Sequence, residues 1–330
     1  MNRPPLYLID YPEAETAMRF LSEKHGIQEA GRFKNLGGLP NTSSVKPHQV
    51  PSEPFIVMNG SGNFHHESYA LYEGFVQAHP DQQFVYIQID AHPDKDDTYR
   101  WKLDCASFVG KVLEHKTVDQ LYLLGLYPVC LDTDNDNRIF IKRLNYFRCE
   151  YFQKLFQYSV EETDVIETIF SYPPNTLEAA QGNPAVDFAK EVTMEVPNTS
   201  HLPESIRPQG EKALEVKWKT LDDFDPHALP QLPIYLTVDL DVARNGVVTD
   251  WRRDPSDEDV TNWGYGDNQG NMEFDDLLKL IRSIGAARPV WGADFCGITE
   301  EFEYMTEEAK DHTLQCIYDV YSALADVVKK

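Results

Sequence analysis

The sequence lacks the features of a membrane or secreted protein. None of its hydrophobic runs approaches the roughly 20 residues that a membrane-spanning helix needs. Residues 1–11 do not show the basic and then apolar pattern of a secretory signal peptide. We therefore expect a cytoplasmic protein with no membrane partner.

Cysteine is scarce and scattered. The five cysteines include no pair with Cys-x-x-Cys spacing; they are Cys105, Cys130, Cys149, Cys296 and Cys316. An odd, dispersed set indicates a reducing compartment and argues against both a disulfide framework and a zinc–thiolate cluster. We expect Cys105 and Cys296 to be buried structural residues near the edges of a sheet.

Basic residues are also in short supply. Lys and Arg number 30 against 54 Asp and Glu, which gives a formal net charge of −24 at pH 7. This balance argues against a nucleic acid or an anionic membrane surface as partner. Hydrophobic residues, by contrast, make up 42% of the 330-residue chain, enough for one large α/β domain or two smaller ones.

The order of apolar patterns predicts an α/β fold. From residue 53 short apolar runs alternate with amphipathic stretches, which is typical of a mainly parallel sheet with helices on both faces, a three-layer αβα arrangement. We expect a single domain over residues 1–330. Residues 1–50 would be an N-terminal extension, and residues 145–230, interrupted by prolines, an irregular elaboration.

The expected elements follow from periodicity. Strands are predicted at residues 6–9, 55–58, 84–89, 121–126, 232–241 and 289–294, with a further one at 137–144. Helices are predicted at residues 12–25, 67–77, 107–115, 272–284 and 306–328. Whether residues 1–50 join the sheet or lie over it is left open.

One motif follows the strand at 84–89 directly. Asp90, His92 and Asp94 stand at alternate positions in Asp-Ala-His-Pro-Asp. If the extended backbone continues, alternate residues point to one side, so two carboxylates and an imidazole converge. The ends of parallel strands are also where ligands are usually held. The motif therefore predicts a metal site.

A second motif strengthens this prediction. The apolar strand at 232–241 ends in two carboxylates, Asp239 and Asp241. Together the motifs supply five ligands, four of them carboxylates, which exceeds what one tetrahedral zinc uses. They suit a pair of hard or borderline ions such as Mn²⁺, bridged by carboxylates.

These motifs resemble those of the arginase/agmatinase (ureohydrolase) family. Residues 90–94 are similar to its Asp-Ala-His-x-Asp signature, and residues 237–241 to its Ser-x-Asp-x-Asp. The family also needs an upstream histidine, normally in Gly-Gly-Asp-His-Ser. Its counterpart lies in the Gly-rich turn at 60–68, where either His65 or His66 is the ligand; we favour His65. The resemblance extends over roughly residues 50–330.

The resemblance implies an arginase/deacetylase-like fold and two divalent ions, most simply Mn²⁺. It assigns the first ion to His65, Asp90, Asp94 and Asp239, and the second to Asp90, His92, Asp239 and Asp241. A hydroxide bound between the two ions would attack a non-peptide carbon–nitrogen bond of a small-molecule substrate, such as a guanidine, an amidine or an amide.

This chain departs from the family pattern at the residue that binds the substrate. Gly297 stands about where the family has the glutamate that binds a guanidino group. Glu300 and Glu301 follow a few residues later and are the candidate replacements, with His66 as a further candidate catalytic residue. We therefore expect arginine and agmatine to be poor substrates.

Two other functions stay open. An Asp-x-Asp motif after a strand also begins Mg²⁺-dependent phosphatases, although Ala243 stands where they need Thr or Val, and the motif comes late in the chain. A metal-binding relative without catalytic activity is the second alternative, favoured by the missing glutamate. Association into a homo-oligomer is neither predicted nor excluded.

Overall fold

The computed structural model describes residues 3–37, 40, 45–92, 94, 103–105, 107–112, 117–126, 166–171, 216–221, 224–243, 272–300, 302 and 305–329. The strand expected at 137–144 and the side chain of Glu301 lie outside these residues. No helix in the described ranges has both the length and the apolar character needed to cross a membrane.

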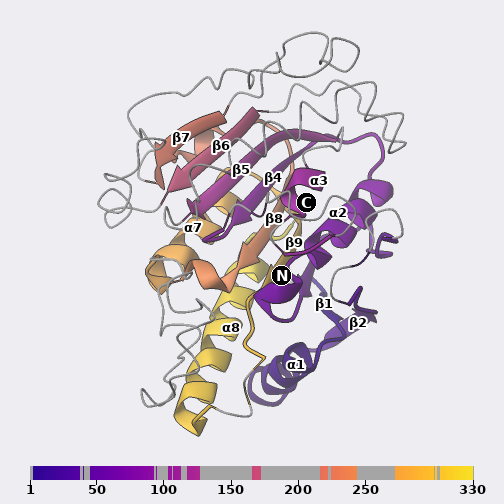
Figure 1. Cartoon of the computed structure of the whole chain (residues 1–330), viewed down its shortest axis with the longest axis vertical. Coiled ribbons are helices and arrows are strands. Elements are labelled where there is room, and N and C mark those ends of the chain that lie inside the picture. The colour runs from indigo at the N-terminus through magenta and orange to yellow at the C-terminus, as the bar shows by residue number, and fades with distance from the viewer. Residues whose placement is uncertain are drawn as a thin grey trace, which may run out of the picture.

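The described strands form one parallel sheet. Its nine strands have the order β2-β1-β3-β9-β8-β4-β5-β6-β7, and Figure 1 labels all of them except β3. Their bounds are β1 Leu6–Ile9, β2 Glu29–Phe33, β3 Phe55–Met58, β4 Phe84–Ile89, β5 Val118–Leu126, β6 Ile166–Ser171, β7 Val216–Thr220, β8 Ile234–Asp239 and β9 Val290–Cys296. Each neighbouring pair is parallel, which confirms the predicted sheet type.

The helices begin and end where their sequences favour it. They are α1 Pro12–His25, α2 Glu67–Ala78, α3 Val109–Val112, α7 Phe274–Ala287 and α8 Glu307–Val327. Helix α1 has Pro at its first turn and ends at Gly26, whose φ of 66° is readily adopted by glycine. Helix α8 is capped by Thr306, whose side chain accepts a hydrogen bond from the Ala309 backbone N–H.

Helices cover both faces of the sheet, as the apolar runs predicted. Alternate residues of a strand point to opposite faces. In β3, for example, Ile56 and Met58 belong to the cluster packed by α1, α7 and α8, while Phe55 and Val57 belong to the cluster packed by α2 and α3. Each large side chain buried in this way contributes roughly 1.5–3 kcal/mol. The fold is therefore a three-layer αβα sandwich.

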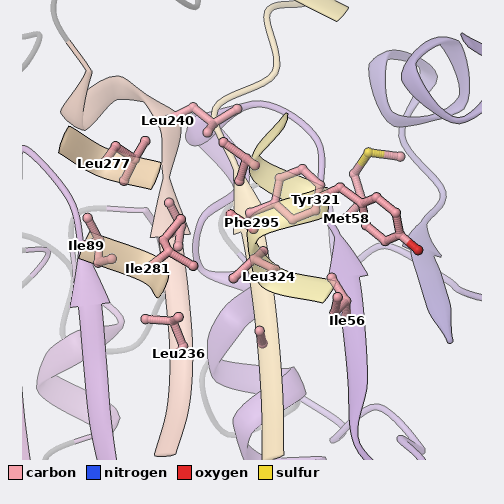
Figure 2. Close-up of a cluster of buried hydrophobic side chains, with 14 of the residues drawn as sticks. Ile56, Met58, Ile89, Leu236, Leu240, Leu277, Ile281, Phe295, Tyr321 and Leu324 are labelled. Carbon is pink, nitrogen blue, oxygen red and sulfur yellow. The ribbon is translucent and has the colours of Figure 1, made fainter. Parts of the chain in front are cut away.

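The first cluster centres on the middle of the sheet. Figure 2 shows side chains from the strands together with side chains from α7 and α8, and its labelled residues are Ile56, Met58, Ile89, Leu236, Leu240, Leu277, Ile281, Phe295, Tyr321 and Leu324. All ten are at most 2% exposed. This packing holds β3, β9, β8 and β4 rigidly side by side.

One open question is answered and two expectations need correction. Residues 1–50 supply two strands of the sheet, β1 and β2. Residues 145–230 are not wholly irregular, because β6 and β7 extend the sheet on its other side. Cys296 ends β9, which lies between β3 and β8 in the interior of the sheet rather than near an edge.

Candidate metal centre

The carboxyl ends of four adjacent strands bring the site residues together. In the sheet these strands stand in the order β3-β9-β8-β4. Asp90 directly follows β4, Asp239 ends β8 and Cys296 ends β9, while His65 follows the short turn of helix η2, Gly62–Phe64, after β3. Strands β8 and β9 separate β3 from β4, and such a break in strand order is where parallel sheets commonly hold ligands.

An inner group forms around His65, which is 1% exposed. Its Nδ1 lies 2.9 Å from Asp94 Oδ2, 3.1 Å from Asp90 Oδ2 and 3.5 Å from Asp239 Oδ2. All three carboxylates are buried. One imidazole nitrogen therefore faces three carboxylates in a space closed to water.

A hydrogen bond made by the other ring nitrogen of His65, Nε2, determines which nitrogen carries the hydrogen. The Thr237 hydroxyl donates to Asp294 Oδ1 over 2.9 Å, so its oxygen accepts from His65 Nε2 over 3.0 Å. Asp294 is in turn held by the hydroxyls of Ser68 and Tyr235. This chain of donors orients the ring and leaves the Nδ1 lone pair directed at the carboxylates.

A cation is the group that fits this arrangement. Nδ1 is buried and has no hydrogen-bond partner among the described residues, and a bare lone pair facing carboxylate oxygens is repulsive. Either a proton on Nδ1 or a metal ion between these atoms removes the repulsion. Burial lowers the pKa of His65, but the surrounding acidic groups outweigh it, so this pKa lies well above its ordinary value.

An outer group lies on the other side of Asp90. His92 Nδ1 is 2.9 Å from Asp241 Oδ2 and 3.6 Å from Asp90 Oδ1. The side chains of His92 and Asp241 are 31% and 25% exposed, so this group is reached from solvent. Asp90 presents Oδ2 to the inner group and Oδ1 to the outer one.

Turns, not an extended backbone, bring the motif residues together. Asp90 Oδ1 accepts a hydrogen bond from the His92 backbone N–H over 2.6 Å, and Asp239 Oδ1 accepts one from the Asp241 N–H over 3.1 Å. Asp94 then adopts a φ of 48°, which Asp tolerates better than most residues. The expectation of an extended run through Asp94 was wrong, because side-chain oxygens of Asp compete for backbone N–H groups and favour turns.

Two glycines enclose Asp239. A Cβ at Gly62 would lie 2.8 Å from Asp239 Oδ2, and one at Gly297 would lie 2.5 Å from Oδ1 and 2.7 Å from the Leu240 nitrogen. Gly297 also has a φ of 89°, which side chains rarely allow. No side chain can therefore stand at position 297 without displacing Asp239.

The carboxylates of the centre have strongly shifted pKa values. Burial, followed by the charges of Asp241 and Asp90, raises the pKa of Asp239 to about 7. Burial and the Asp90 charge raise the pKa of Asp94 well above its ordinary value. For Asp90, burial acts in the same direction, but hydrogen bonds with His65 and His92 outweigh it and lower the pKa. A multiply charged cation would stabilise the ionised form of carboxylates that lie this close together.

The remaining candidate residues lie at the margin of the centre. His66 is buried but turns away, and its Nε2 contacts the Gly37 carbonyl at 3.0 Å. Burial lowers its pKa. Glu300 accepts a hydrogen bond from the Asn63 amide over 3.0 Å. Neither side chain reaches the carboxylates, and Glu301 lies outside the described residues.

Two contributors were missed from the sequence. Gln88 is fully buried, and its amide donates to Asp90 Oδ2 over 2.6 Å and to Asp94 Oδ2 over 3.1 Å. The sequence signal that could have identified Gln88 is an amide side chain inside an apolar strand, two residues before Asp90. Cys296 is also fully buried, and a sulfur–nitrogen–oxygen group of Cys296, His65 and Asp239 has its atoms within 4.8 Å of one another. No sequence pattern marked this cysteine.

Comparison with known proteins gives structural matches alone. No protein-family model and no curated protein matches the chain. Formimidoylglutamase from Bacillus subtilis aligns with 99% of this chain and 87% of its own, at 12% identity and a TM-score of 0.46. Proclavaminate amidino hydrolase from Streptomyces clavuligerus aligns with 99% of this chain and 94% of its own, at 13% identity and a TM-score of 0.46. A T. brucei arginase-like protein aligns with 99% of this chain and 88% of its own, at 9% identity and a TM-score of 0.48.

Proposed function

We propose that the chain hydrolyses a non-peptide carbon–nitrogen bond of a small molecule with the help of two divalent metal ions. The observation that carries the proposal is Asp90, which presents one oxygen to the buried group around His65 and the other to the exposed group around His92. A carboxylate shared between two ligand groups is suited to bridge a pair of ions.

The residues present fit such a pair. The inner ion would be held by His65, Asp90, Asp94 and Asp239, and the outer ion by Asp90, His92, Asp239 and Asp241. The first set is buried, while His92 and Asp241 are partly exposed. The motif resemblance implies manganese for both. When bound, such ions lower the pKa of a coordinated water to about 7 and so supply a nucleophile near neutral pH.

The protein groups hold this centre in place. Thr237 and Asp294 fix the His65 ring, and the Gln88 amide donates to Asp90 and Asp94. Substrate would approach from the side of His92 and Asp241, because these are the exposed members. Burial of the remaining ligands keeps bulk water from the inner carboxylates.

The backbone at Gly297 narrows the substrate class. A free guanidinium is best recognised by a carboxylate, whose two oxygens match its planar donors. Position 297 holds no side chain and has no room for one beside Asp239. Glu300 is engaged by Asn63 at the margin. We therefore expect arginine and agmatine to be poor substrates and a different amidine, ureido compound or acylated amine to be preferred.

A substrate panel tests this proposal. Chelator-treated protein, reloaded with Mn²⁺ or Zn²⁺, is assayed for ammonia, urea and amine release from guanidines, amidines, ureido compounds and acylated amines. We expect turnover of one of the compounds other than arginine and agmatine. Asp241→Asn should abolish it, whereas Asp276→Asn on the surface of α7 should not. Urea release from arginine at about 10 s⁻¹ or more would contradict the substrate assignment.

Metal binding without turnover is the second candidate function. The absence of a carboxylate at Gly297 favours it. Bound metal with no product from any compound would support this candidate against the hydrolase. Release of phosphate from an aryl phosphate, with no carbon–nitrogen hydrolysis, would instead favour a phosphatase. Protein that binds no metal at all would overturn both the hydrolase and the metal-binding candidate.

A further inference from the structure

We propose that Cys296 is a ligand of the inner ion and that the inner position therefore takes a thiophilic ion such as zinc. This inference rests on the proposed metal centre but assigns a residue and a metal class that the motif resemblance does not contain. Its basis is the register of two neighbouring strands, the closeness of three ligand atoms and the orientation of the His65 ring.

The register places Cys296 beside a predicted bridging residue. Strands β8 and β9 are parallel neighbours, and Asp239 is paired directly with Cys296. Paired residues of neighbouring strands send their side chains to the same face of the sheet. The thiol and the Asp239 carboxylate therefore point together, at the carboxyl edge where His65 also lies.

The spacing is that of atoms able to share an ion. Zinc lies about 2.3 Å from sulfur, about 2.0–2.1 Å from nitrogen and about 2.0–2.2 Å from oxygen, so two ligands of a tetrahedral zinc stand about 3.3–3.7 Å apart. The Cys296 sulfur, a His65 nitrogen and an Asp239 oxygen lie within 4.8 Å of one another, and all three residues are buried. A small adjustment brings the three onto one ion.

An independent observation points into the same space. His65 Nδ1 is buried without a hydrogen-bond partner among the described residues, and Thr237 holds the ring so that this atom faces the carboxylates. A structural cysteine would more usually pack among apolar side chains. Cys296 instead lies close to His65 and Asp239, whose side chains point toward the same space.

A thiolate changes which metal the site prefers. Soft sulfur ligands favour zinc, cobalt and ferrous iron over manganese, which prefers oxygen. The thiol proton leaves to solvent as the sulfur binds, and no electron is transferred. The described outer group contains only nitrogen and oxygen ligands, so the two positions differ in metal preference.

Cobalt substitution tests the assignment without an activity assay. The chelator-treated full chain is loaded with Co²⁺ and its absorbance recorded, because a cobalt–thiolate bond produces a charge-transfer band in the near ultraviolet. We expect the band in the wild type and in Cys316→Ser, a matched change at another buried cysteine. We expect it to disappear in Cys296→Ser while the visible cobalt bands remain. The zinc-over-manganese preference in competition should fall roughly tenfold or more in that variant, a loss comparable to those seen when partners of metal ligands are removed.

The outcomes separate this inference from the function it rests on. Cobalt binding without a charge-transfer band in the wild type, or a band that survives Cys296→Ser, overturns the cysteine ligand and leaves the metal centre standing. No cobalt binding overturns both. Should Cys296→Ser fail to fold, a chain with the other four cysteines changed to serine decides: retention of the band supports Cys296, and its loss overturns the assignment.

Discussion

Two neighbouring histidines show how much a single side chain's surroundings matter. His65 and His66 are both 1% exposed. His65 Nδ1 faces three carboxylates, whereas His66 contacts the Gly37 carbonyl. Burial lowers the pKa of His66, while the acids around His65 reverse that effect. Burial alone therefore cannot identify the ligand, but the charges facing each ring can.

This pair gives a matched test of the metal assignment. His65→Ala should lose the inner ion, because it removes the imidazole nitrogen that faces both Asp90 and Asp94. His66→Ala should keep that ion, since the contacts it removes are with the Gly37 carbonyl and the Phe64 ring. Elemental analysis of metal-loaded protein, with circular dichroism to verify folding, measures both. Equal metal loss in two folded variants would contradict the assignment.

Gly297 allows a second prediction at this scale. Gly297→Ala places a Cβ 2.5 Å from Asp239 Oδ1 at a φ of 89°. Left-handed backbone strain costs about 1–2 kcal/mol for a residue with a Cβ, and the displaced carboxylate would also weaken metal binding. We expect a lower Tm and weaker metal affinity. Gly37→Ala is the control, because its φ of 73° gives the same backbone strain while its Cβ meets no other atom. Unchanged metal affinity in Gly297→Ala would contradict the predicted displacement of Asp239.

The sequence predicted that these acidic residues and histidines gather at one end of the sheet, but not the turns by which they converge. Asp90, His92, Asp239 and Asp241 follow apolar strands, and that position is visible in a sequence. Gln88 and Cys296 carry no motif, and their importance depends on which strands lie side by side. Contacts between distant segments of a parallel sheet leave no local pattern, so residue types alone did not reveal them.

At the scale of elements, α7 and α8 pack closely at one glycine. A Cβ at Gly285 would lie 2.1 Å from the Val327 Cβ. Gly285→Ala gains about 1 kcal/mol of helix propensity but must force the helices apart, and overpacking typically costs about 1–3 kcal/mol. Because the obstructing atom is the branched Cβ of Val327, we expect overpacking to dominate.

Thermal unfolding measures this effect. Gly285→Ala should lower Tm by a few degrees. Ala286→Ser adds one atom at an exposed position of the same helix and should change stability by no more than about 0.5 kcal/mol. A Tm for Gly285→Ala at or above that of the wild type would show that the helices move apart freely.

Both helices and strands with a strong local pattern were predicted well, and the bounds expected for β1, β3 and β4 are those observed. The bounds expected for α1 are those observed, and α8 differs by one residue at each end. Helical periodicity is a local signal, and in α8 the residues Leu314, Ile317, Tyr321 and Leu324, spaced three or four apart, are all buried. The strands β6 and β7 were missed, because prolines dominate the sequence around them and an edge of a sheet tolerates weak patterns.

At the scale of the whole molecule, we expect the centre to make metal-free protein less stable as pH rises. Burial and neighbouring carboxylates raise the pKa of Asp239 from 3.8 to about 7. Between these values the folded state keeps a proton that the unfolded chain has released, so the free energy of unfolding falls as pH increases. This contribution is fully present below about pH 4 and is lost as pH passes through about 7. The pKa values of His65 and Asp94 shift in the same direction.

Bound ions should reverse this dependence, because metal replaces those protons. Between pH 5 and 8 we expect Tm to fall in chelator-treated protein and the gain in Tm from added metal to grow. Each proton accounts for up to about 1.4 kcal/mol per pH unit. Asp239→Asn should flatten the slope of the chelated protein. Identical slopes with and without metal would contradict the link between the centre and stability.

The strand order has a consequence for how the chain is made. Strands β8 and β9 come from the last third of the sequence, yet they lie between β3 and β4. Until residue 239 has left the ribosome β4 lacks its neighbour β8, and until residue 296 has left it β3 lacks its neighbour β9, so each strand has an open edge. Exposed edges of apolar strands readily pair with other chains. We therefore expect the nascent chain to be prone to such pairing during synthesis, and premature termination before β8 would leave a divided sheet and four of the six proposed metal ligands.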